Sequence, residues 1–422
     1  MYYSRWADIE EIKENCTVLN KNSQNDKAGI PVLYDKDKVY TLDPSYHTLV
    51  IGSEGSGKTQ AAILPLIKMA KNANNSMVIN DVRGDLYKTT KEQLVNNGYK
   101  VICVNYQDPS LGNGFNPLDI PFKLYQDNND KALQMVEEVG YYLLNYGKIE
   151  GDPFWENTAI DYFTGLALYL FEQGDENNIS ISSIYNLSNE INQDRKEFVS
   201  KLDKKSNIYA YLTATLLAPP ETYGSILSVF HQKIRKYIVG NNLKKMLDKS
   251  DYNMMDVISD KVAVFIISST NNYSDHLVPL IFNQVYSIKE TYSDSKQAIN
   301  MIIDDFDFLI PMRNFVKTLN YARSINVNYT VTVKTFTNLI NAYGKETFEM
   351  MKVCFSNLIY LISNDVDTLK QISDYCGNQG KDRKLISIDE LKRLKNFEAI
   401  ILVVRCMPYR VNLIPDYKVE WE

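Results

Sequence analysis

Histidine and cysteine are scarce in this sequence, and neither is placed as a metal or disulfide site requires. The three histidines stand alone at His47, His231 and His276. The five cysteines are odd in number, scattered, and never in CxxC spacing. The sequence therefore argues against a disulfide framework and against a zinc site. It also argues against histidine-based metal or triad chemistry and favours a reducing compartment.

Long apolar runs are missing too, because the best of them, at 262–267 and 277–282, have the size of a core strand or helix. A membrane helix needs about 20 apolar residues in succession. A basic surplus is also absent, since 46 Lys and Arg stand against 52 Asp and Glu, a net charge of −6. A protein that coats nucleic acid with its whole surface is strongly basic. Any nucleic-acid contact is therefore expected in a local patch or channel.

What the sequence does contain is a regular alternation of strand and helix patterns. Apolar runs typical of buried strands recur at 47–51, 76–80, 100–105, 262–268, 301–303, 329–333, 357–363 and 399–404. Helical patterns lie between them, which predicts a parallel α/β sheet flanked by helices. Residues 128–256 differ, because their apolar residues recur at helical spacing and strand-like runs are lacking. We therefore predict an α/β domain made of 1–127 and 257–422, interrupted by an all-α insertion at 128–256.

One motif carries chemistry directly. It fits GxxxxGK[ST] without a gap and reads Gly52-Ser53-Glu54-Gly55-Ser56-Gly57-Lys58-Thr59, with Gln60 directly after it. In this pattern glycines let backbone N–H groups point at phosphates, and the helix that follows adds its N-terminal dipole. Lys58 would reach the β- and γ-phosphates, and the Thr59 hydroxyl would bind Mg²⁺. The alternative is a glycine-rich turn that happens to end in Lys-Thr.

A P-loop of this kind needs carboxylates at the end of a neighbouring strand. The run Met301-Ile302-Ile303-Asp304-Asp305 places two acids after three apolar residues. Asp304 would hold Mg²⁺ through water, and Asp305 would orient or polarise the attacking water. The alternative is a strand that ends in an acidic turn, since Asp is common in turns. Asp307 lies beyond the useful pair and is predicted to be a surface acid.

A second acidic segment, Asp81-Val82-Arg83-Gly84-Asp85, follows the strand predicted at 76–80. The carboxyl ends of parallel strands face the ligand crevice, so Asp81 is a candidate for the nucleotide site. The alternative is a charged strand-to-helix turn with Asp85 as the helix N-cap.

Taken together, these segments resemble the type IV coupling proteins, the TraG-type ATPases of conjugation and type IV secretion. The resemblance covers nearly the whole chain and depends on the order and spacing of its landmarks. In chain order, these landmarks are Ser4-Arg5-Trp6-Ala7 with Glu10-Glu11-Ile12-Lys13, the strand and P-loop from His47, Pro65 in the helix after the loop, the 81–85 segment with Arg83 in the place of a Lys, Asn116-Pro117-Leu118, Asp152-Pro153-Phe154-Trp155-Glu156, Asp304-Asp305-Phe306, Tyr343-Gly344 and Asn364-Asp365.

The resemblance implies a RecA-like motor with an all-α insertion, working as a hexameric ring with ATP and Mg²⁺ between subunits. It also implies an arginine finger from the neighbouring subunit, for which Arg323 is the candidate. The alternative for Arg323 is an ordinary surface residue at a helix end.

Three departures from the family pattern stand out. Asp305 replaces the usual Glu, which withdraws the carboxylate by one methylene and would slow hydrolysis. Lys334 stands where the family often has a Gln that senses the γ-phosphate. The usual N-terminal membrane helices are missing, so either the chain is shortened or a separate membrane subunit provides the anchor.

The resemblance implies a coupling ATPase, cytoplasmic and recruited to the inner face of the cell membrane. It would receive a relaxase with its single-stranded DNA and feed it to a secretion channel, with ATP hydrolysis stimulated by DNA. Its membrane partner would be a channel subunit or a small recruiter protein. We expect a monomer or weak oligomer in isolation and a hexamer in the working state.

Two other functions stay open. One is a nucleotide-bound docking platform with little turnover, which the Asp305 and Lys334 departures favour. The other is a small-molecule kinase, although no acceptor-binding lid is evident. Within the helical region, the basic clusters Lys201–Lys205 and Lys233–Lys245 could touch DNA, but solvated helix faces are the favoured interpretation.

Overall fold

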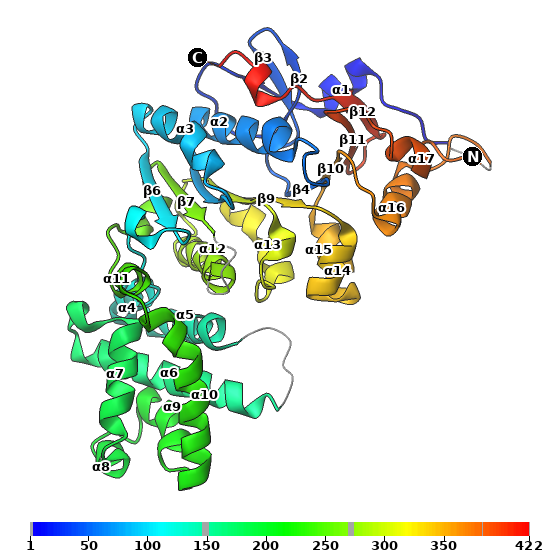
Figure 1. Ribbon diagram of the computed structural model, residues 1–422. Helices are drawn as coiled ribbons and strands as arrows, with labels where there is room; N and C mark the ends of the chain where they lie inside the picture. Colours follow the sequence, from blue (N-terminus) through cyan, green and yellow to red (C-terminus); the bar gives the residue numbers. More distant parts are fainter. Residues whose placement is uncertain (1–2, 146–151, 269–273, 382, 422) are drawn as a thin grey trace. The chain divides into compact units, whose positions relative to one another are not determined.

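A computed structural model describes residues 3–145, 152–268, 274–381 and 383–421 (Figure 1). The chain divides into two compact units. The first consists of Met1–Val101, Asp256–Ile266 and Tyr292–Glu422, and the second of Ile102–Met255 and Ile267–Thr291. The domain boundaries expected at 127/128 and 256/257 stay a prediction about where an insertion begins and ends.

The described residues include a nine-stranded mixed sheet (Figure 1). Its order is β12 (Tyr409–Asn412), β11 (Glu398–Val403), β10 (Asn357–Tyr360), β4 (Thr48–Ile51), β9 (Val327–Val333), β8 (Ile299–Ile303), β5 (Ser76–Asn80), β7 (Val262–Ile267) and β6 (Lys100–Asn105). Neighbouring strands from β10 to β7 run parallel, whereas β11 is antiparallel to both β10 and β12. The carboxyl ends of β4, β9, β8 and β5 therefore meet at one edge.

The central strands are buried along their whole length. Every residue of β4, β5, β7 and β8 is buried. A parallel strand covered on both faces is expected to be a continuous apolar run, which is why these strands could be predicted from the sequence. The predicted strands at 76–80 and 100–105 have the same bounds in the structure, and the others differ at their ends by a few residues.

Helices cover the two faces of this sheet. In Figure 1, α2 (Leu64–Asn72) and α3 (Asp85–Asn96) lie on one side of it, and α13 (Phe315–Ala322), α14 (Phe336–Tyr343) and α15 (Lys345–Cys354) on the other. Further along the chain are α16 (Val366–Cys376) and α17 (Ile388–Leu391). A π-helical turn, Thr59–Ile63, precedes α2, and Pro65 lies in the first turn of α2. The missing N–H of a proline costs little at such a position.

The amino-terminal residues form elements that the sequence did not reveal. The short helix α1 (Ile9–Asn15) is capped by the Asp8 side chain, which accepts a hydrogen bond from the Glu11 N–H. A small antiparallel sheet follows, in the order β1 (Thr17–Asn20), β3 (Lys38–Thr41) and β2 (Pro31–Asp35).

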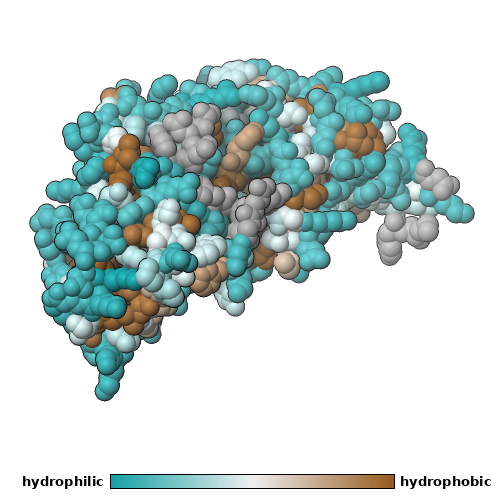
Figure 2. Space-filling view, turned by 60° about the horizontal axis from the view of Figure 1, so that its bottom comes forward, coloured by the Kyte–Doolittle hydropathy of each residue, from teal (hydrophilic) through white to brown (hydrophobic). Residues whose placement is uncertain are grey.

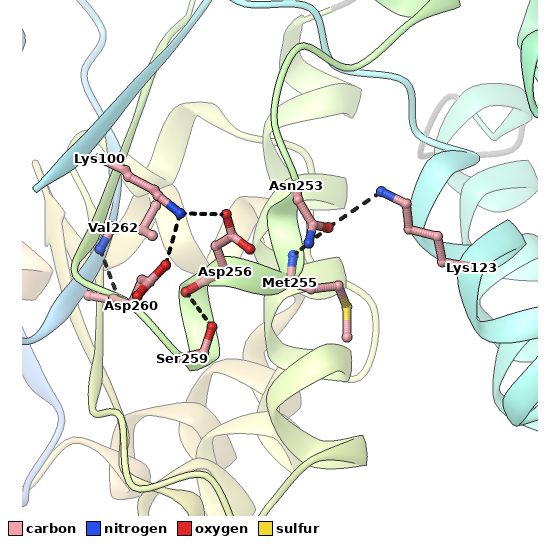
Figure 3. A network of polar contacts seen from close by, with 9 residues as sticks. Lys100, Lys123, Asn253, Met255, Asp256, Ser259, Asp260 and Val262 are labelled. Atoms are coloured by element: carbon pink, nitrogen blue, oxygen red, sulfur yellow. Dashed lines mark hydrogen bonds and ion pairs between the residues drawn. The ribbon is translucent and has the colours of Figure 1, made fainter.

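Ion pairs fix the start of β6. The Lys100 ammonium lies 3.0 Å from Asp256 Oδ2 and 2.8 Å from Asp260 Oδ2 (Figure 3). The Lys100 N–H donates to the Lys261 carbonyl just before β7. In the second unit, Lys123 Nζ lies 3.4 Å from Asn253 Oδ1 (Figure 3).

The second unit is built from helices. They are α4 (Asp119–Asp127), α5 (Asn129–Leu144), α6 (Phe154–Gln173), α7 (Ile181–Ile191), α8 (Arg195–Ser200), α9 (Asn207–Leu216), α10 (Pro220–Ile238), α11 (Asn241–Asp248) and α12 (Ser274–Thr291). Helix α6 packs against α5, α7, α9 and α10, and ten of its residues are buried. It is therefore the central helix of this unit.

The basic clusters of this unit behave differently from each other. Lys201 is exposed and pairs with Glu197 one helical turn away, as expected of a solvated face. Lys233 is buried and forms an ion pair with Glu156, and it also donates to the Leu144 carbonyl. The interpretation as a solvated face is therefore wrong for Lys233, because its ammonium group is buried and paired with the Glu156 carboxylate inside the unit.

No described helix combines the length and the apolarity needed to cross a membrane. The surface in Figure 2 is mostly hydrophilic, with hydrophobic residues in small separate groups.

Candidate nucleotide-binding site

The P-loop lies at the carboxyl edge of the parallel strands. It leaves β4 at Ile51 and is tied to the strands on either side. The Gly52 N–H donates to the Val333 carbonyl at the end of β9, at 3.0 Å, and the Ser53 N–H donates to the Ile362 carbonyl beyond β10, at 2.7 Å. These bonds place the loop where ligands of parallel α/β sheets bind.

Two glycines of the motif are required by the path of the backbone. Gly55 has φ +76° and Gly57 has φ +92°, which side chains rarely tolerate. A Cβ on Gly57 would also lie 2.6 Å from Cε1 of Phe397. The spacing of the motif thus matches a local geometry that other residues would disturb.

The loop offers donors to a phosphate. Lys58 is 7% exposed, and its ammonium lies 2.7 Å from the Gly52 carbonyl and 3.4 Å from that of Ser53, against the loop itself. The Ser56 hydroxyl is buried and has no hydrogen-bond partner. Helical structure begins at Thr59, so its first N–H groups point toward the loop. An orphaned hydroxyl, an ammonium and a helix N-terminus together fit a bound phosphate.

A cavity of about 260 Å³ opens beside the loop. It is lined from four strand ends, by Glu54, Gly55, Lys58, Thr59, Gln60, Leu64, Asp81, Val82, Arg83, Asp85, Leu86, Thr89, Asp304, Asp305 and Lys334. The structure thus brings the P-loop, the 81–85 segment, the acid pair and Lys334 to one place, although they are far apart in the sequence. The roles predicted for these residues stay predictions.

The acid pair follows β8 directly. The Asp304 Oδ1 atom accepts a hydrogen bond of 2.5 Å from the Thr332 hydroxyl. The Asn80 side-chain amide donates to the Asp304 carbonyl at 2.8 Å. Burial raises the pKa of Asp304, and the neighbouring Asp305 raises it further, while the Thr332 hydrogen bond and Lys58 oppose that rise. Asp305 has φ +50°, the left-handed region.

The cavity also offers oxygens for Mg²⁺. No described group of three or more His, Cys, Asp or Glu residues forms a complete metal site. Mg²⁺ in nucleotide sites keeps several waters and takes few protein ligands besides phosphate. The Thr59 hydroxyl and the Asp304 carboxylate, which both line the cavity, fit such a site.

Asp81 accepts the capping hydrogen bond that the alternative interpretation gave to Asp85. Its Oδ2 atom accepts from the Tyr87 N–H at 2.8 Å, in the first turn of α3. Burial raises the pKa of Asp81, while these backbone hydrogen bonds lower it. The N-cap position is held by Gly84 with φ +74°, and Asp85 is the first helical residue. The alternative in which Asp85 is the N-cap is therefore wrong, because the capping oxygen comes from Asp81, just after β5.

Asp307 was predicted to be a surface acid, and this is wrong. Its Oδ2 atom accepts from the Lys334 N–H at 3.2 Å and from the Asn338 side-chain amide at 2.6 Å. Burial raises its pKa. Asp307 thereby fixes the backbone of Lys334 at the rim of the cavity.

The rim also carries an ion-pair bridge that the sequence did not reveal. Glu54, near the tip of the P-loop, lies 2.6 Å from Arg83 and 3.9 Å from Lys334. Arg83 holds the pKa of Glu54 below its usual range, with Lys334 contributing. Arg83 stands where the resembled family has a Lys. That correspondence was the feature of the sequence from which a role of Arg83 in the site could have been predicted.

Arg323 lies elsewhere in its own chain. It follows α13, before β9 begins, at the opposite edge of the sheet from the P-loop. Its Nε donates to the Ser45 carbonyl at 2.8 Å, and its guanidinium lies 4.4 Å from the centre of the Tyr46 ring. The structure therefore does not bring Arg323 to the P-loop of the same chain, and its action in a neighbouring subunit stays a prediction.

Solved structures of other proteins share this fold, among them these three. The unbound bacterial conjugative coupling protein TrwBdeltaN70 matches with a TM-score of 0.71 and 14% identity, covering 98% of this chain and 93% of that one. The plasmid coupling protein TrwB in complex with ADP and Mg²⁺ matches with a TM-score of 0.70 and 15% identity, covering 98% and 94%. VirB4 of Thermoanaerobacter pseudethanolicus matches with a TM-score of 0.57 and 12% identity, covering 93% and 98%. These likenesses confirm the predicted RecA-like α/β fold.

A comparison of the sequence with curated proteins found no match. The model of the family described as Type IV secretory system Conjugative DNA transfer matches residues 5–405. That match spans both compact units and confirms the resemblance inferred from the order of the landmarks. The chain belongs to the type IV secretory system conjugative DNA transfer family.

Proposed function

We propose that this chain is an ATP-driven coupling protein of a conjugative type IV secretion system. The observation that carries the proposal is the single cavity in which the P-loop, a Thr hydroxyl and two carboxylates meet, in a member of a DNA-transfer family. A phosphate cradle beside paired acids is the arrangement that NTP hydrolysis requires. The related TrwB has been solved with ADP and Mg²⁺ and with an ATP analogue, which supports ATP and Mg²⁺ as the cofactors here.

The proposed roles follow from position. The P-loop N–H groups and Lys58 bind the phosphates, with Ser56 donating its free hydroxyl. Thr59 and Asp304 hold Mg²⁺, whose charge stabilises the β- and γ-phosphate oxygens. Asp305 orients the attacking water, and Lys334 contacts the γ-phosphate. Arg323 of a neighbouring subunit completes the site in a hexameric ring.

The substrate and partners of the proposed motor are those of conjugation. It receives a relaxase with its single-stranded DNA and passes it to a secretion channel, through a channel confined to the ring. It acts at the inner face of the cell membrane, held there by a membrane-anchored channel subunit or a small recruiter protein. Affinity capture from native cells that returns a relaxase and a membrane protein supports these partners.

The decisive test is ATP hydrolysis with and without single-stranded DNA. We expect DNA to stimulate turnover. We expect Lys58→Ala to lose at least about 10²-fold, because a charge-stabilising donor at the reacting phosphate is worth that much. Lys392→Ala removes an exposed lysine far along the chain and is the matched control, with full turnover expected. A wild-type protein that binds no nucleotide contradicts the proposal.

A low-turnover docking platform is the second candidate, and one observation favours it. Lys334 lies near the Glu54 carboxylate and over the Phe308 ring, while Asp305 is a methylene shorter than the usual Glu. Nucleotide binding without turnover, in the presence of DNA and the captured partners, would establish the platform instead of the motor.

A further inference from the structure

Thr332 joins the two acids of the candidate site through one hydroxyl group. It lies in β9, beside β8, and its side chain is fully buried. Its hydroxyl donates to Asp304 Oδ1 at 2.5 Å and accepts from the Asp305 N–H at 2.9 Å. Nothing in the sequence pattern singled out this residue, since a Thr in a buried strand is ordinary.

The bond to Asp304 determines how that carboxylate is used. One of its oxygens is committed to Thr332, which leaves the other oxygen for the cavity that Asp304 lines. An outer-shell hydrogen bond of this kind fixes the orientation of a carboxylate that serves a metal. Without this hydrogen bond, the Asp304 carboxylate could rotate about its last torsion, which is broad for Asp.

The bond from Asp305 restrains the backbone. Asp305 has φ +50°, a conformation that non-glycine residues adopt only when their surroundings hold them. The Thr332 hydroxyl accepts its N–H from the β9 side, while Asn80 of β5 holds the Asp304 carbonyl from the other side. The turn that carries both acids is therefore clamped between the two strands that flank β8.

We propose that Thr332 is a positioning residue for ATP hydrolysis, acting through Asp304 and Asp305. A purely structural role would need only a side chain of this shape, which Val supplies. The hydroxyl adds two hydrogen bonds, and both end on the residues proposed to hold Mg²⁺ and to orient water. This inference rests on the proposed function of the same site.

The test compares Thr332→Val, which keeps the shape, with Thr332→Ser, which keeps the hydroxyl. We expect Thr332→Val to lower kcat by about 10²-fold, the usual cost of a misplaced reacting group, with KM changed little. We expect Thr332→Ser to stay within a few-fold of wild type. Thr330→Val, the same substitution on the same strand, is the control, because no hydrogen bond joins the described Thr330 side chain to either acid.

A second measurement does not depend on turnover. Binding of a fluorescent ATP analogue is titrated with and without Mg²⁺. We expect Thr332→Val to keep its Mg²⁺-free affinity but to lose most of the affinity that Mg²⁺ adds, and Thr332→Ser to retain it. This readout decides the matter even if the protein turns over slowly.

The outcomes separate this inference from the proposed function. If the wild-type protein binds no nucleotide, both the proposed function and the role of Thr332 are refuted. If wild type binds and hydrolyses ATP while Thr332→Val matches it in kcat and in Mg²⁺-dependent affinity, only the role of Thr332 falls. Equal losses in the Val and Ser variants, together with a lowered melting temperature in both, indicate packing and also overturn it.

Discussion

The two ends of the parallel strands carry cavities of similar size and opposite chemistry. At the carboxyl end, about 260 Å³ is lined by the P-loop and by acids such as Asp304 and the buried Asp81. At the amino end, about 230 Å³ is lined by Lys27, Lys296 and Arg323 with one carboxylate beside them. One end combines a phosphate cradle with acids suited to a metal, and the other gathers cations.

This difference bears on how the site works. Lys58 and Arg323 belong to the same unit and yet lie at opposite edges of one sheet, so Arg323 cannot add its charge to the phosphates that its own P-loop would hold. The contacts of Arg323 with Ser45 and Tyr46 hold it at the amino end. If the cations of that end act in hydrolysis, they act on the nucleotide of a second copy.

The variant with the largest expected effect tests whether Arg323 acts on the nucleotide of a neighbouring copy. Arg323→Ala should lower DNA-stimulated turnover by about 10³-fold or more, the usual contribution of an arginine supplied by a neighbour. The nucleotide affinity of this variant should stay near wild type, because Arg323 does not line the P-loop cavity of its own chain. Lys317→Ala removes an exposed lysine from α13, the helix that precedes Arg323. It is the control and should keep full turnover.

Mixing experiments sharpen this prediction. Lys58→Ala has a damaged P-loop and an intact Arg323, whereas Arg323→Ala has the reverse. In mixed oligomers, some sites combine the intact P-loop of an Arg323→Ala subunit with the intact Arg323 of a Lys58→Ala subunit. Turnover should therefore recover to a measurable fraction of wild type. Unchanged turnover in Arg323→Ala, or no recovery of turnover on mixing, would refute the prediction that Arg323 at the amino end acts on the nucleotide of a second copy.

The carboxyl end could be predicted from the sequence to a large extent. The P-loop is contiguous, and its glycines are dictated by local backbone geometry. Asp304 and Asp305 follow a strand that is buried on both faces and is therefore a continuous apolar run. Local patterns of this kind need no knowledge of long-range contacts.

The parts that escaped prediction depend on contacts between distant residues. Thr332 meets the acids, and Asp307 meets Asn338, only after β8 and β9 have paired. Asp85 looked like a cap because it begins the helix, but the carboxylate that accepts is Asp81. The strands of the small sheet and β12 were missed because they are short and partly exposed, as the alternating burial of β12 shows.

A prediction of intermediate size concerns His47, at the amino end of β4. Its Nδ1 accepts from the Tyr329 N–H at 3.0 Å, and its Nε2 lies 2.8 Å from the Leu319 carbonyl, to which it donates. Burial lowers its pKa from 6.5 to about 4, and Arg323 contributes to that lowering. The folded protein thus keeps His47 neutral in a pH range where the unfolded chain takes up a proton.

The sign of the effect follows from that difference. Because the unfolded state binds more protons between pH 6.5 and 4, stability falls as pH falls through this window. The full loss from His47 is about 3 kcal/mol. We expect urea titrations to show it in wild type and not in His47→Gln. His276, whose pKa is also lowered to about 4 by burial, is present in both proteins and cancels. Parallel pH profiles for the two proteins would refute the assignment.

The smallest expected effect lies at the carboxyl end, in the Arg83–Glu54 ion pair. Both side chains are 68% exposed, so solvent screens their attraction and an exposed pair of this kind adds little stability. We expect Arg83→Ala and Glu54→Gln, alone or combined, to leave the urea midpoint unchanged, at low salt and at 1 M salt alike. The contrary result is a urea midpoint that drops in each single variant at low salt and returns to the wild-type value when salt screens the charges. It would mean that the ion pair stabilises the P-loop. The carboxyl end would then be held by surface charge as well as by its backbone, and its contrast with the cationic amino end would be weaker than the buried contacts imply.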